Sequence, residues 1–360
     1  MDPLTHTLFG ASLAATDLGR KTRLATPALI IGANLPDVDV LPYFRGGDFA
    51  LGFRRGWTHG VLALVVLPAL LAGLLWLWDK WRVRSDVERQ PLSPGWLLGL
   101  SYFACLTHPC LDWLNYNGMR WWMPFRDTWY YGDSVFIMDP WLWLVLGTGW
   151  LIGRKPARSS TIGAVVMATL VVWLVASRAP AYMPVVGSVF AVLLVAFLWQ
   201  PKAGWFTAHR TATLGLLSAT LYIGILISIH SVTVSRVQEM LPEQGIDSFD
   251  ELLAGPTPAN PLAWDIVVGT EKVYRWGRLD WLDGGNLVLS EGELPAAREL
   301  PQWNAIVASG QSPGFLRWTR FPWWEASQEG DAKQLYLMDA RYARHRTSGF
   351  GGAVFQLPAD

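Results

Sequence analysis

Six histidine and aspartate side chains with metal-ligand chemistry occur in the first 112 residues of this 360-residue chain. The segment THPCLD places His108 and Asp112 four residues apart, which puts both side chains on one face of a helix, about one turn apart. That spacing suits two ligands of a single metal ion, provided that Pro109 lies at or near the start of a helix. The other candidate ligands are Asp37 and Asp39 in NLPDVD, His59 in RGWTHG, and His6.

This ligand set combines imidazole and carboxylate groups without a thiolate. Zn²⁺ fits such a set best, with Mn²⁺ or Fe²⁺ as alternatives. Six ligands exceed what one tetrahedral ion with an open position can use, so one or two ions are compatible with the set. A pair of ions about 3.5–4 Å apart activates water for attack on esters, phosphoesters especially. Whichever of Asp37 and Asp39 binds metal less tightly is the catalytic candidate that orients or deprotonates this water.

Four arginines are candidates to bind the substrate. Arginine holds a phosphate group by bidentate hydrogen bonds, and two of the four shortly precede His59 in RRGWTHG. The alternative, that these arginines only anchor the chain at a membrane interface, stays open. The four candidates are Arg54, Arg55, Arg120 and Arg126.

The composition of the chain is that of a membrane protein. The chain is 51% hydrophobic and 16% charged, whereas soluble domains are ordinarily about 25% charged. Its 22 tryptophans fit rings that lie at the headgroup level of a bilayer. Lys plus Arg equals Asp plus Glu at 29 each, so the bulk charge does not indicate a nucleic-acid partner.

Six apolar runs approach the length of a transmembrane helix, which needs about 20 residues to cross the hydrocarbon core. Polar residues interrupt the second and third of these runs. Before the first run, residues 3–18 and 24–33 are each too short for an upright crossing, and we expect them to form a helical hairpin partly buried in the membrane. The predicted spans are 58–78, 94–114, 136–153, 161–177, 182–200 and 212–230.

Lys and Arg in the short loops predict the orientation of the spans, because cytoplasmic loops carry an excess of both. By this rule the loops at 79–93, 154–160 and 201–211 are cytoplasmic. All six candidate ligands then lie near the outer face, and the C-terminal 130 residues lie in a periplasm or its equivalent. Ionisable residues in spans are costly and usually mark a site, so this agreement in depth is the main argument for one shared pocket.

From about residue 231, Pro and Gly separate short runs rich in Val, Tyr, Trp and Leu, a pattern typical of antiparallel strands. Examples are LAWDIVVG, KVYRWGRLDWL, NLVLS, FLRWTRF and QLYLMDARY. The predicted fold class is therefore mainly α, a polytopic helical membrane bundle with a small β-rich extramembrane domain. The predicted domains are an N-terminal hairpin with metal ligands at 1–57, a six-span bundle at 58–230 and a β-rich periplasmic domain at 231–360.

The segments that carry the candidate ligands resemble a bacterial family of inner-membrane, metal-dependent hydrolases, the YdjM-type proteins. The resemblance covers roughly the first 130 residues and implies a multi-pass inner-membrane hydrolase. More distantly, the order His, Asp, His and His-x-x-x-Asp is similar to zinc-dependent phospholipase C and P1 nuclease, although no later His-x-x-x-Glu follows here. The matching segments are THTLFGA at 5–11, NLPDVD at 34–39, RRGWTHGVLA at 54–63 and SYFACLTHPCLDWLN at 101–115.

These features predict a membrane-embedded hydrolase that acts on an ester or phosphoester at the outer membrane face. The headgroup depth of the site favours a membrane lipid or lipid-linked substrate. Two alternatives stay open. Six spans with buried ionisable groups also describe a transporter or exporter, although a transporter usually carries such groups near the midplane. A non-catalytic scaffold, in which metal staples the hairpin to the spans, would show the same sequence pattern.

Each candidate ligand also has a purely structural interpretation. An aspartate can serve as a turn or cap residue, a histidine can lie near a helix start, and a buried His–Asp pair can simply be hydrogen-bonded. These alternatives stay open for all six candidates. Asp139, by contrast, is predicted to cap a helix that begins at Pro140 rather than to bind metal.

Overall fold

The computed structural model divides into two compact units, and each unit draws on separate stretches of the chain. This grouping differs from the three predicted domains, because residues 39–54 belong with the C-terminal unit. The residues described are 1–82, 90–152, 158–192, 207–329, 332–346 and 350–356. The first unit holds Met1–Val38, Arg55–Ser228 and Pro256–Pro261, and the second holds Asp39–Arg54, Ile229–Gly255 and Leu262–Asp360.

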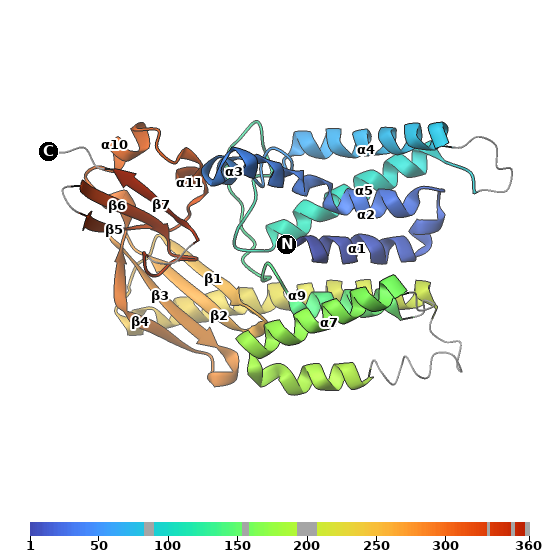
Figure 1. Ribbon diagram of the computed structural model, residues 1–360. Coiled ribbons are helices and arrows are strands. Elements are labelled where there is room, and N and C mark those ends of the chain that lie inside the picture. Colours follow the sequence, from blue (N-terminus) through green and yellow to red (C-terminus); the bar gives the residue numbers. More distant parts are fainter. Residues whose placement is uncertain (83–89, 153–157, 193–206, 330–331, 347–349, 357–360) are drawn as a thin grey trace. The chain divides into compact units, whose positions relative to one another are not determined.

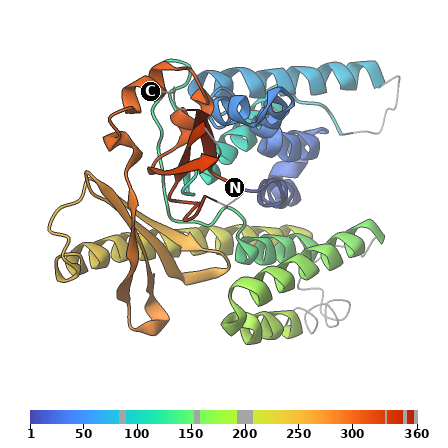
Figure 2. The same cartoon turned by 60° about the vertical axis from the view of Figure 1, so that its left-hand side comes forward.

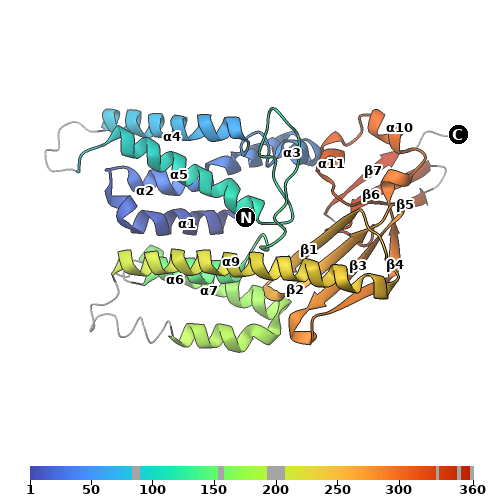
Figure 3. The same cartoon turned by 180° about the vertical axis from the view of Figure 1, so that it is seen from behind.

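The first unit is helical and begins with the predicted N-terminal hairpin. Asp2 caps the first helix by accepting hydrogen bonds from the backbone N–H groups of Leu4 and Thr5, which lack helical partners. The hairpin helices α1 and α2 pack on each other, and α2 also packs on α5; Figure 1 and Figure 3 show these helices with α4 side by side. The helices of this unit include α1 (Pro3–Ala15), η1 (Asp17–Arg20), α2 (Ala25–Asn34), α4 (Val61–Arg82), α5 (Pro94–Trp113), α6 (Pro140–Leu151), α7 (Arg158–Arg178), η3 (Pro180–Tyr182) and the first part of α9 (Ala208–Met240).

Small residues allow α1, α2 and α5 to approach closely. A methyl group added at Gly10 of α1 would lie 2.7 Å from the backbone oxygen of Leu29 in α2. One added at Gly32 of α2 would lie 2.9 Å from the Cβ of Ala104 in α5. Both distances are too short for real atoms, so neither position accepts a side chain without movement. Close contact at small residues is the usual way in which membrane helices associate, and here it fixes the hairpin against α5.

Three described helices are long and apolar enough to cross a membrane, which supports the prediction of a membrane protein. They match the predicted spans at 58–78, 161–177 and 212–230. Charged residues lie mainly at their ends, as Lys80 and Arg82 do in the last turn of α4, where long cationic side chains reach the headgroups. The three helices are α4, residues Thr161–Arg178 of α7, and α9.

The predicted count of six spans is not confirmed. At the second predicted span, α5 has 20 residues but carries His108 and Asp112 in its last turns. At the third, α6 has only 12 residues, too few to cross a bilayer alone. The predicted span at 182–200 lies partly outside the described residues, and its described part belongs to the apolar helical segment Pro180–Val192.

Asp139 caps α6, as predicted. Its Oδ1 accepts hydrogen bonds from the backbone N–H groups of Trp141 at 2.8 Å and Leu142 at 3.1 Å, and Pro140 occupies the first helical position. Its Oδ2 accepts a hydrogen bond from the hydroxyl of Tyr222 in α9 at 3.0 Å. The carboxylate is therefore used to start one helix and to attach it to another, which is a structural role.

The second unit contains the antiparallel sheets predicted for the C-terminal part of the chain. Four strands pair in the order β1-β2-β3-β4 and three in the order β5-β6-β7. The C-terminal part of α9 packs on the first sheet, where Val237 and Leu241 are buried with Trp264 and Leu279; Figure 2 shows this helix beside the sheet. The strands are β1 (Glu251–Thr257), β2 (Asn260–Gly269), β3 (Val273–Asp280), β4 (Asn286–Pro295), β5 (Pro322–Glu329), β6 (Ala332–Asp339) and β7 (Gly352–Gln356).

The prediction of a strand for FLRWTRF, residues 315–321, is wrong, because its first four residues belong to the helix α11 (Pro313–Trp318). Phe315 and Trp318 are both buried, and a spacing of three is the period of a helix face rather than of a strand. Asp48 caps this helix by accepting hydrogen bonds from the N–H groups of Gly314 at 3.1 Å and Phe315 at 2.8 Å. The remaining short helices with residues in this unit are η2 (Leu35–Arg45), α3 (Gly47–Phe53), η4 (Pro242–Gln244), η5 (Trp281–Asp283), η6 (Ala297–Glu299) and α10 (Trp303–Ala308).

Asp339, at the end of β6, is a buried carboxylate that organises the second sheet. It accepts hydrogen bonds from Thr319 Oγ1 at 2.9 Å, the backbone N–H of Arg320 at 2.7 Å and Arg341 Nη2 at 2.8 Å. Burial alone would raise the pKa of Asp339, but the Arg341 charge and the hydrogen bonds outweigh burial and hold this pKa below its usual value. The ionised carboxylate therefore stabilises the fold above its unfolded pKa of about 3.9, and this contribution is lost as the pH falls through the native pKa.

We expect Asp339→Asn to destabilise the C-terminal unit by about 3–5 kcal/mol at pH 7, because Arg341 loses its buried partner. Hydrogen exchange of the full-length protein, read in peptides from β6, should be faster in the variant than in the wild type at pH 7. The difference should shrink as the pH falls below about 4, where the carboxyl of the unfolded chain takes up a proton, and should be lost once the pH has passed through the lowered native pKa. Asp283→Asn, at an exposed position, is the control. Equal protection of wild type and Asp339→Asn at pH 7 would contradict this role.

Candidate metal centre

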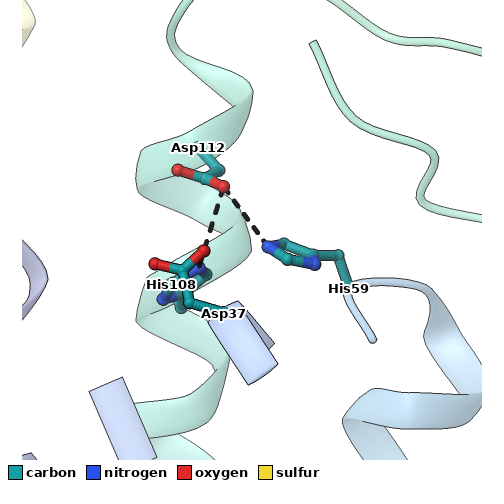
Figure 4. Close-up of side chains that lie close together, drawn as sticks. All are labelled: Asp37, His59, His108 and Asp112. Carbon is teal, nitrogen blue, oxygen red and sulfur yellow. Dashed lines mark ion pairs between the residues drawn. The ribbon is translucent and has the colours of Figure 1, made fainter. Parts of the chain in front are cut away.

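Four of the six candidate ligands converge in the first unit. One ligand atom from each of Asp37, His59, His108 and Asp112 lies within 4.8 Å of the other three. Figure 4 shows His108 and Asp112 one turn apart on α5, with Asp37 beside His108 and His59 reaching toward Asp112 from the segment before α4. Three stretches that are separate in the sequence thus contribute to one cluster.

The helix α5 supplies two of these four side chains from one buried face. It begins with Ser93 as the cap residue and Pro94 in the first turn. The condition that Pro109 lies at or near a helix start is not met, because Pro109 lies inside α5. The proline lacks one backbone N–H, but the neighbouring turns continue, and His108 and Asp112 are both fully buried on the same face.

A backbone contact fixes the protonation of His108. Its Nδ1 lies 2.7 Å from the carbonyl oxygen of Ala33 in α2. A carbonyl only accepts hydrogen bonds, so Nδ1 carries a proton, and in the neutral ring that a metal requires Nε2 is the atom with the free lone pair. Such a bond from the second ring nitrogen to a carbonyl is typical of histidines that bind metal. Nε2 of His108 therefore faces Asp37 and Asp112 as a ligand.

The donor atoms are spaced as the ligands of one ion would be. Nε2 of His108 lies 3.6 Å from Oδ1 of Asp37 and 3.7 Å from Oδ2 of Asp112, and Nε2 of His59 lies 3.3 Å from Oδ2 of Asp112. Ligand atoms of a tetrahedral zinc ion, with bonds of about 2.0–2.1 Å, are about 3.3–3.4 Å apart.

Two of these atoms are also unsatisfied. Nε2 of His108 and Oδ2 of Asp112 are buried and have no hydrogen-bond partner within the described part of the chain. A buried polar atom without a partner costs about 1–3 kcal/mol. A divalent cation between them would satisfy both lone pairs at once, so the residues present fit a metal ion.

His6 borders the cluster without belonging to the four-residue group. Its Nε2 lies 3.3 Å from Oδ1 of Asp112, and its ring stacks on that of His108 with 3.7 Å between the centroids. The backbone nitrogen of Met1 also lies against Oδ1 of Asp112. His6 is therefore placed to be a fifth ligand or to hold Asp112 in position.

Asp39 is not a member of the group, although Asp37 is. Both residues lie in the 3₁₀ helix η2, in which side chains two residues apart point in directions about 240° apart around the axis. Asp39 is buried, and its Oδ1 accepts a hydrogen bond from Nε of Arg54 at 3.2 Å. The two aspartates of NLPDVD thus have different partners.

Among the predicted substrate-binding arginines, Arg55 lies at the cluster. Its side chain is buried, and its Nη2 lies 3.5 Å from Oδ1 of Asp112. Arg120 is also buried, donates a hydrogen bond to Oδ1 of Asp127 at 2.7 Å and lies over the ring of Trp129. Arg54 is paired with Asp39 as described, and Arg126 is exposed. A role of these other arginines in substrate binding stays a prediction.

Asn115 is a neighbour of the cluster to which the sequence patterns assigned no role. It is fully buried just past the end of α5, and its Oδ1 accepts a hydrogen bond from Nη1 of Arg55 at 2.8 Å. Its position, three residues after Asp112 and seven after His108, continues the helix face that carries the ligands. That spacing is the signal that could have found it.

The fold and the cluster together define a helical membrane protein with a candidate metal centre in its N-terminal half. A family model matches residues 1–181, just over half of the 360-residue chain, and this stretch contains all four converging ligands. The chain belongs to the family of YdjM inner membrane proteins. No curated protein and no solved structure matches it significantly, so the resemblance to zinc-dependent phospholipase C and P1 nuclease is not shown.

Proposed function

We propose that this protein is a membrane-embedded, metal-dependent hydrolase of esters or phosphoesters. The observation that carries the proposal is the convergence of two imidazoles and two carboxylates, spaced as the ligands of a divalent ion. Zn²⁺ suits this set best, with Mn²⁺ or Fe²⁺ as alternatives. When bound, such an ion supplies Lewis-acid chemistry and lowers the pKa of water toward neutrality.

We assign proton transfer to Asp37. Its side chain is 19% exposed, whereas that of Asp112 is 1% exposed, so Asp37 is the carboxylate of the cluster that solvent reaches. Asp37 accepts a proton from the attacking water, whose oxygen forms a bond to the phosphorus or the carbonyl carbon. The bond to the leaving oxygen breaks, and the proton passes from Asp37 to that oxygen. His59, His108 and Asp112 would hold the ion.

The place of the cluster along α4 supports a substrate at the membrane surface. His59 lies two residues before Val61, where the candidate span α4 begins, and the backbone N–H of Val61 donates to the carbonyl of Trp121 at 2.8 Å. The segment that follows exposes Trp122 and Phe125, and aromatic rings are enriched at headgroup level. A lipid or lipid-linked phosphoester is therefore the proposed substrate. We further propose that the site and the C-terminal unit face the periplasm.

Turnover by the full-length protein in lipid nanodiscs tests the proposal. Zinc-loaded protein should hydrolyse members of a panel of phosphodiesters, phospholipids and carboxyl esters, chelation should abolish the activity, and added zinc should restore it. Cys110→Ser is the matched control, because Cys110 is exposed on α5 between the two ligands. Zinc binding without turnover of any ester would contradict a hydrolase and favour the scaffold. Substrate uptake by vesicles that persists without the ligands would favour a transporter.

A further inference from the structure

We infer that Arg55 and Asn115 form an anion-binding pair beside the metal centre, and that the substrate carries a phosphoryl group rather than a neutral carboxyl ester. This inference rests on the proposed function, because it names the class of substrate for the same site. It concerns two buried side chains that contact each other, Asn115 from the end of α5 and Arg55 from the segment before α4, and Arg55 also lies against the ligand Asp112.

Arg55 is held so that one of its terminal nitrogens faces the metal ligands. Nη1 donates hydrogen bonds to Oδ1 of Asn115 at 2.8 Å and to the carbonyl of Gly118 at 3.2 Å. Nη2 lies 3.5 Å from Oδ1 of Asp112, which is longer than an ordinary hydrogen bond. The guanidinium is buried, so its charge acts in a medium of low dielectric constant, where its attraction for an anion is strong.

The backbone at Arg55 adopts a strained conformation that directs this side chain. Its φ is 54°, in the left-handed region that residues other than glycine rarely occupy. The carbonyl of Arg55 accepts a hydrogen bond from the N–H of Arg120 at 2.8 Å, and a methyl group added at Gly56 would lie 2.6 Å from the Arg120 guanidinium. The surrounding structure therefore enforces the strain. Such residues cluster at functional sites, and an arginine that only anchors the chain in headgroups needs no such turn.

Asn115, which is bonded to Arg55, carries a second buried hydrogen-bond donor. Its Oδ1 accepts hydrogen bonds from Nη1 of Arg55 and from the backbone N–H of Asn117 at 2.9 Å. Two donors fix the orientation of the amide, so Nδ2 lies on the opposite side of the group. Nδ2 is buried and has no hydrogen-bond partner among the residues that the structure describes. An unsatisfied buried donor costs about 1–3 kcal/mol, which an anionic oxygen would offset.

The charges of the site favour a phosphoryl group over a neutral ester. The carboxylates of Asp37 and Asp112 match the two charges of a divalent ion, so the Arg55 guanidinium adds positive potential beside a set that is neutral once loaded. A phosphate ester carries negative oxygens before and during reaction, and arginine binds them by charge-assisted hydrogen bonds. A carboxyl ester develops comparable charge only in the transition state. Arg55 and Asn115 therefore favour a substrate that is already negatively charged before the reaction begins.

Binding of inorganic phosphate to the full-length, zinc-loaded protein tests the inference, with isothermal titration calorimetry as the readout. The wild type should bind phosphate, and Arg55→Gln and Asn115→Asp should each weaken the affinity by at least about tenfold. Asn115→Asp retains the oxygen that accepts from Arg55 but replaces the N–H donor by a negative charge. Arg55→Lys, which keeps the charge, should recover part of the affinity. The zinc content, measured by mass spectrometry, should equal that of the wild type in all three variants.

Asn117→Asp is the matched control, because it adds the same charge two residues away on a half-buried side chain, and it should bind phosphate nearly as the wild type does. Unchanged phosphate affinity in Arg55→Gln and Asn115→Asp would overturn the inference and leave metal-dependent hydrolysis intact. Loss of zinc in both variants would also overturn it, because the pair would then support the ligands rather than an anion. A wild type that binds no zinc, manganese or iron would refute the proposed function, while phosphate binding that still depended on Arg55 and Asn115 would support the pair.

Discussion

Replacement of His108 by alanine should abolish stable metal binding. Nε2 of His108 lies between both carboxylates of the cluster, 3.6 Å from Asp37 and 3.7 Å from Asp112. Its removal takes away one of the four converging ligand groups. The two carboxylates, Asp37 and Asp112, then repel each other without an imidazole between them. Loss of an outer partner of a ligand alone costs about 10–100-fold in metal affinity, so loss of the ligand itself should cost at least about 100-fold.

The measurement is the zinc content of purified protein after dialysis against metal-free buffer, by mass spectrometry. Wild type should retain about one ion per chain, because His59, His108 and Asp112 supply the three protein ligands of a catalytic site, and His108→Ala should retain almost none. His209→Ala is the matched control, since His209 is partly exposed at the start of α9 and lies near Asp17. Equal metal content in wild type and His108→Ala, or no zinc, manganese or iron in either, would remove the metal centre and the hydrolase with it.

Replacement of Asp37 by asparagine should lower kcat by about 10²–10⁴-fold at saturating zinc, the usual size of a general-base contribution. The amide oxygen can still occupy the ligand position, but it cannot accept the proton of the attacking water. Zinc binding should therefore weaken less than turnover does. The combination of retained metal and lost turnover distinguishes proton transfer from coordination alone.

Asp39→Asn is the informative comparison for Asp37→Asn, because it makes the same change two residues away. Asp39 is bonded to Arg54 and lies outside the ligand group, so its loss of kcat should be the smaller of the two. Turnover is measured at matched zinc occupancy for both variants. If Asp39→Asn lost more turnover than Asp37→Asn, the assignment of the base to Asp37 would be wrong.

The pairing of His108 with Asp112 could be predicted because it depends only on the helical period. Four residues bring two side chains to one face whatever the rest of the fold does. The choice between Asp37 and Asp39 could not be predicted in this way. It depends on the 3₁₀ geometry of η2 and on the position of Arg54, neither of which the spacing of NLPDVD determines.

Hydropathy predicted α4, α7 and α9, since each presents a long apolar stretch to the membrane. Hydropathy was less informative for α5. This helix is long enough for a span, but its last turns carry the polar residues His108 and Asp112. The least predictable feature was the contact between Asp48 and the start of α11. It joins residues 266 positions apart, and local propensity contains no information about such a cap.

Gly32 allows the close approach of α2 to α5, the helix that carries His108 and Asp112. It lies one residue before Ala33, which orients His108, and five before Asp37, and a methyl group added to it would lie 2.9 Å from the Cβ of Ala104. A side chain at this position would push α2 away from α5. We expect this to move the carboxylate of Asp37 by more than the roughly 0.2 Å that metal–ligand distances tolerate. The precise spacing that a metal site needs therefore depends on a glycine, which has no side chain with which to bind the metal.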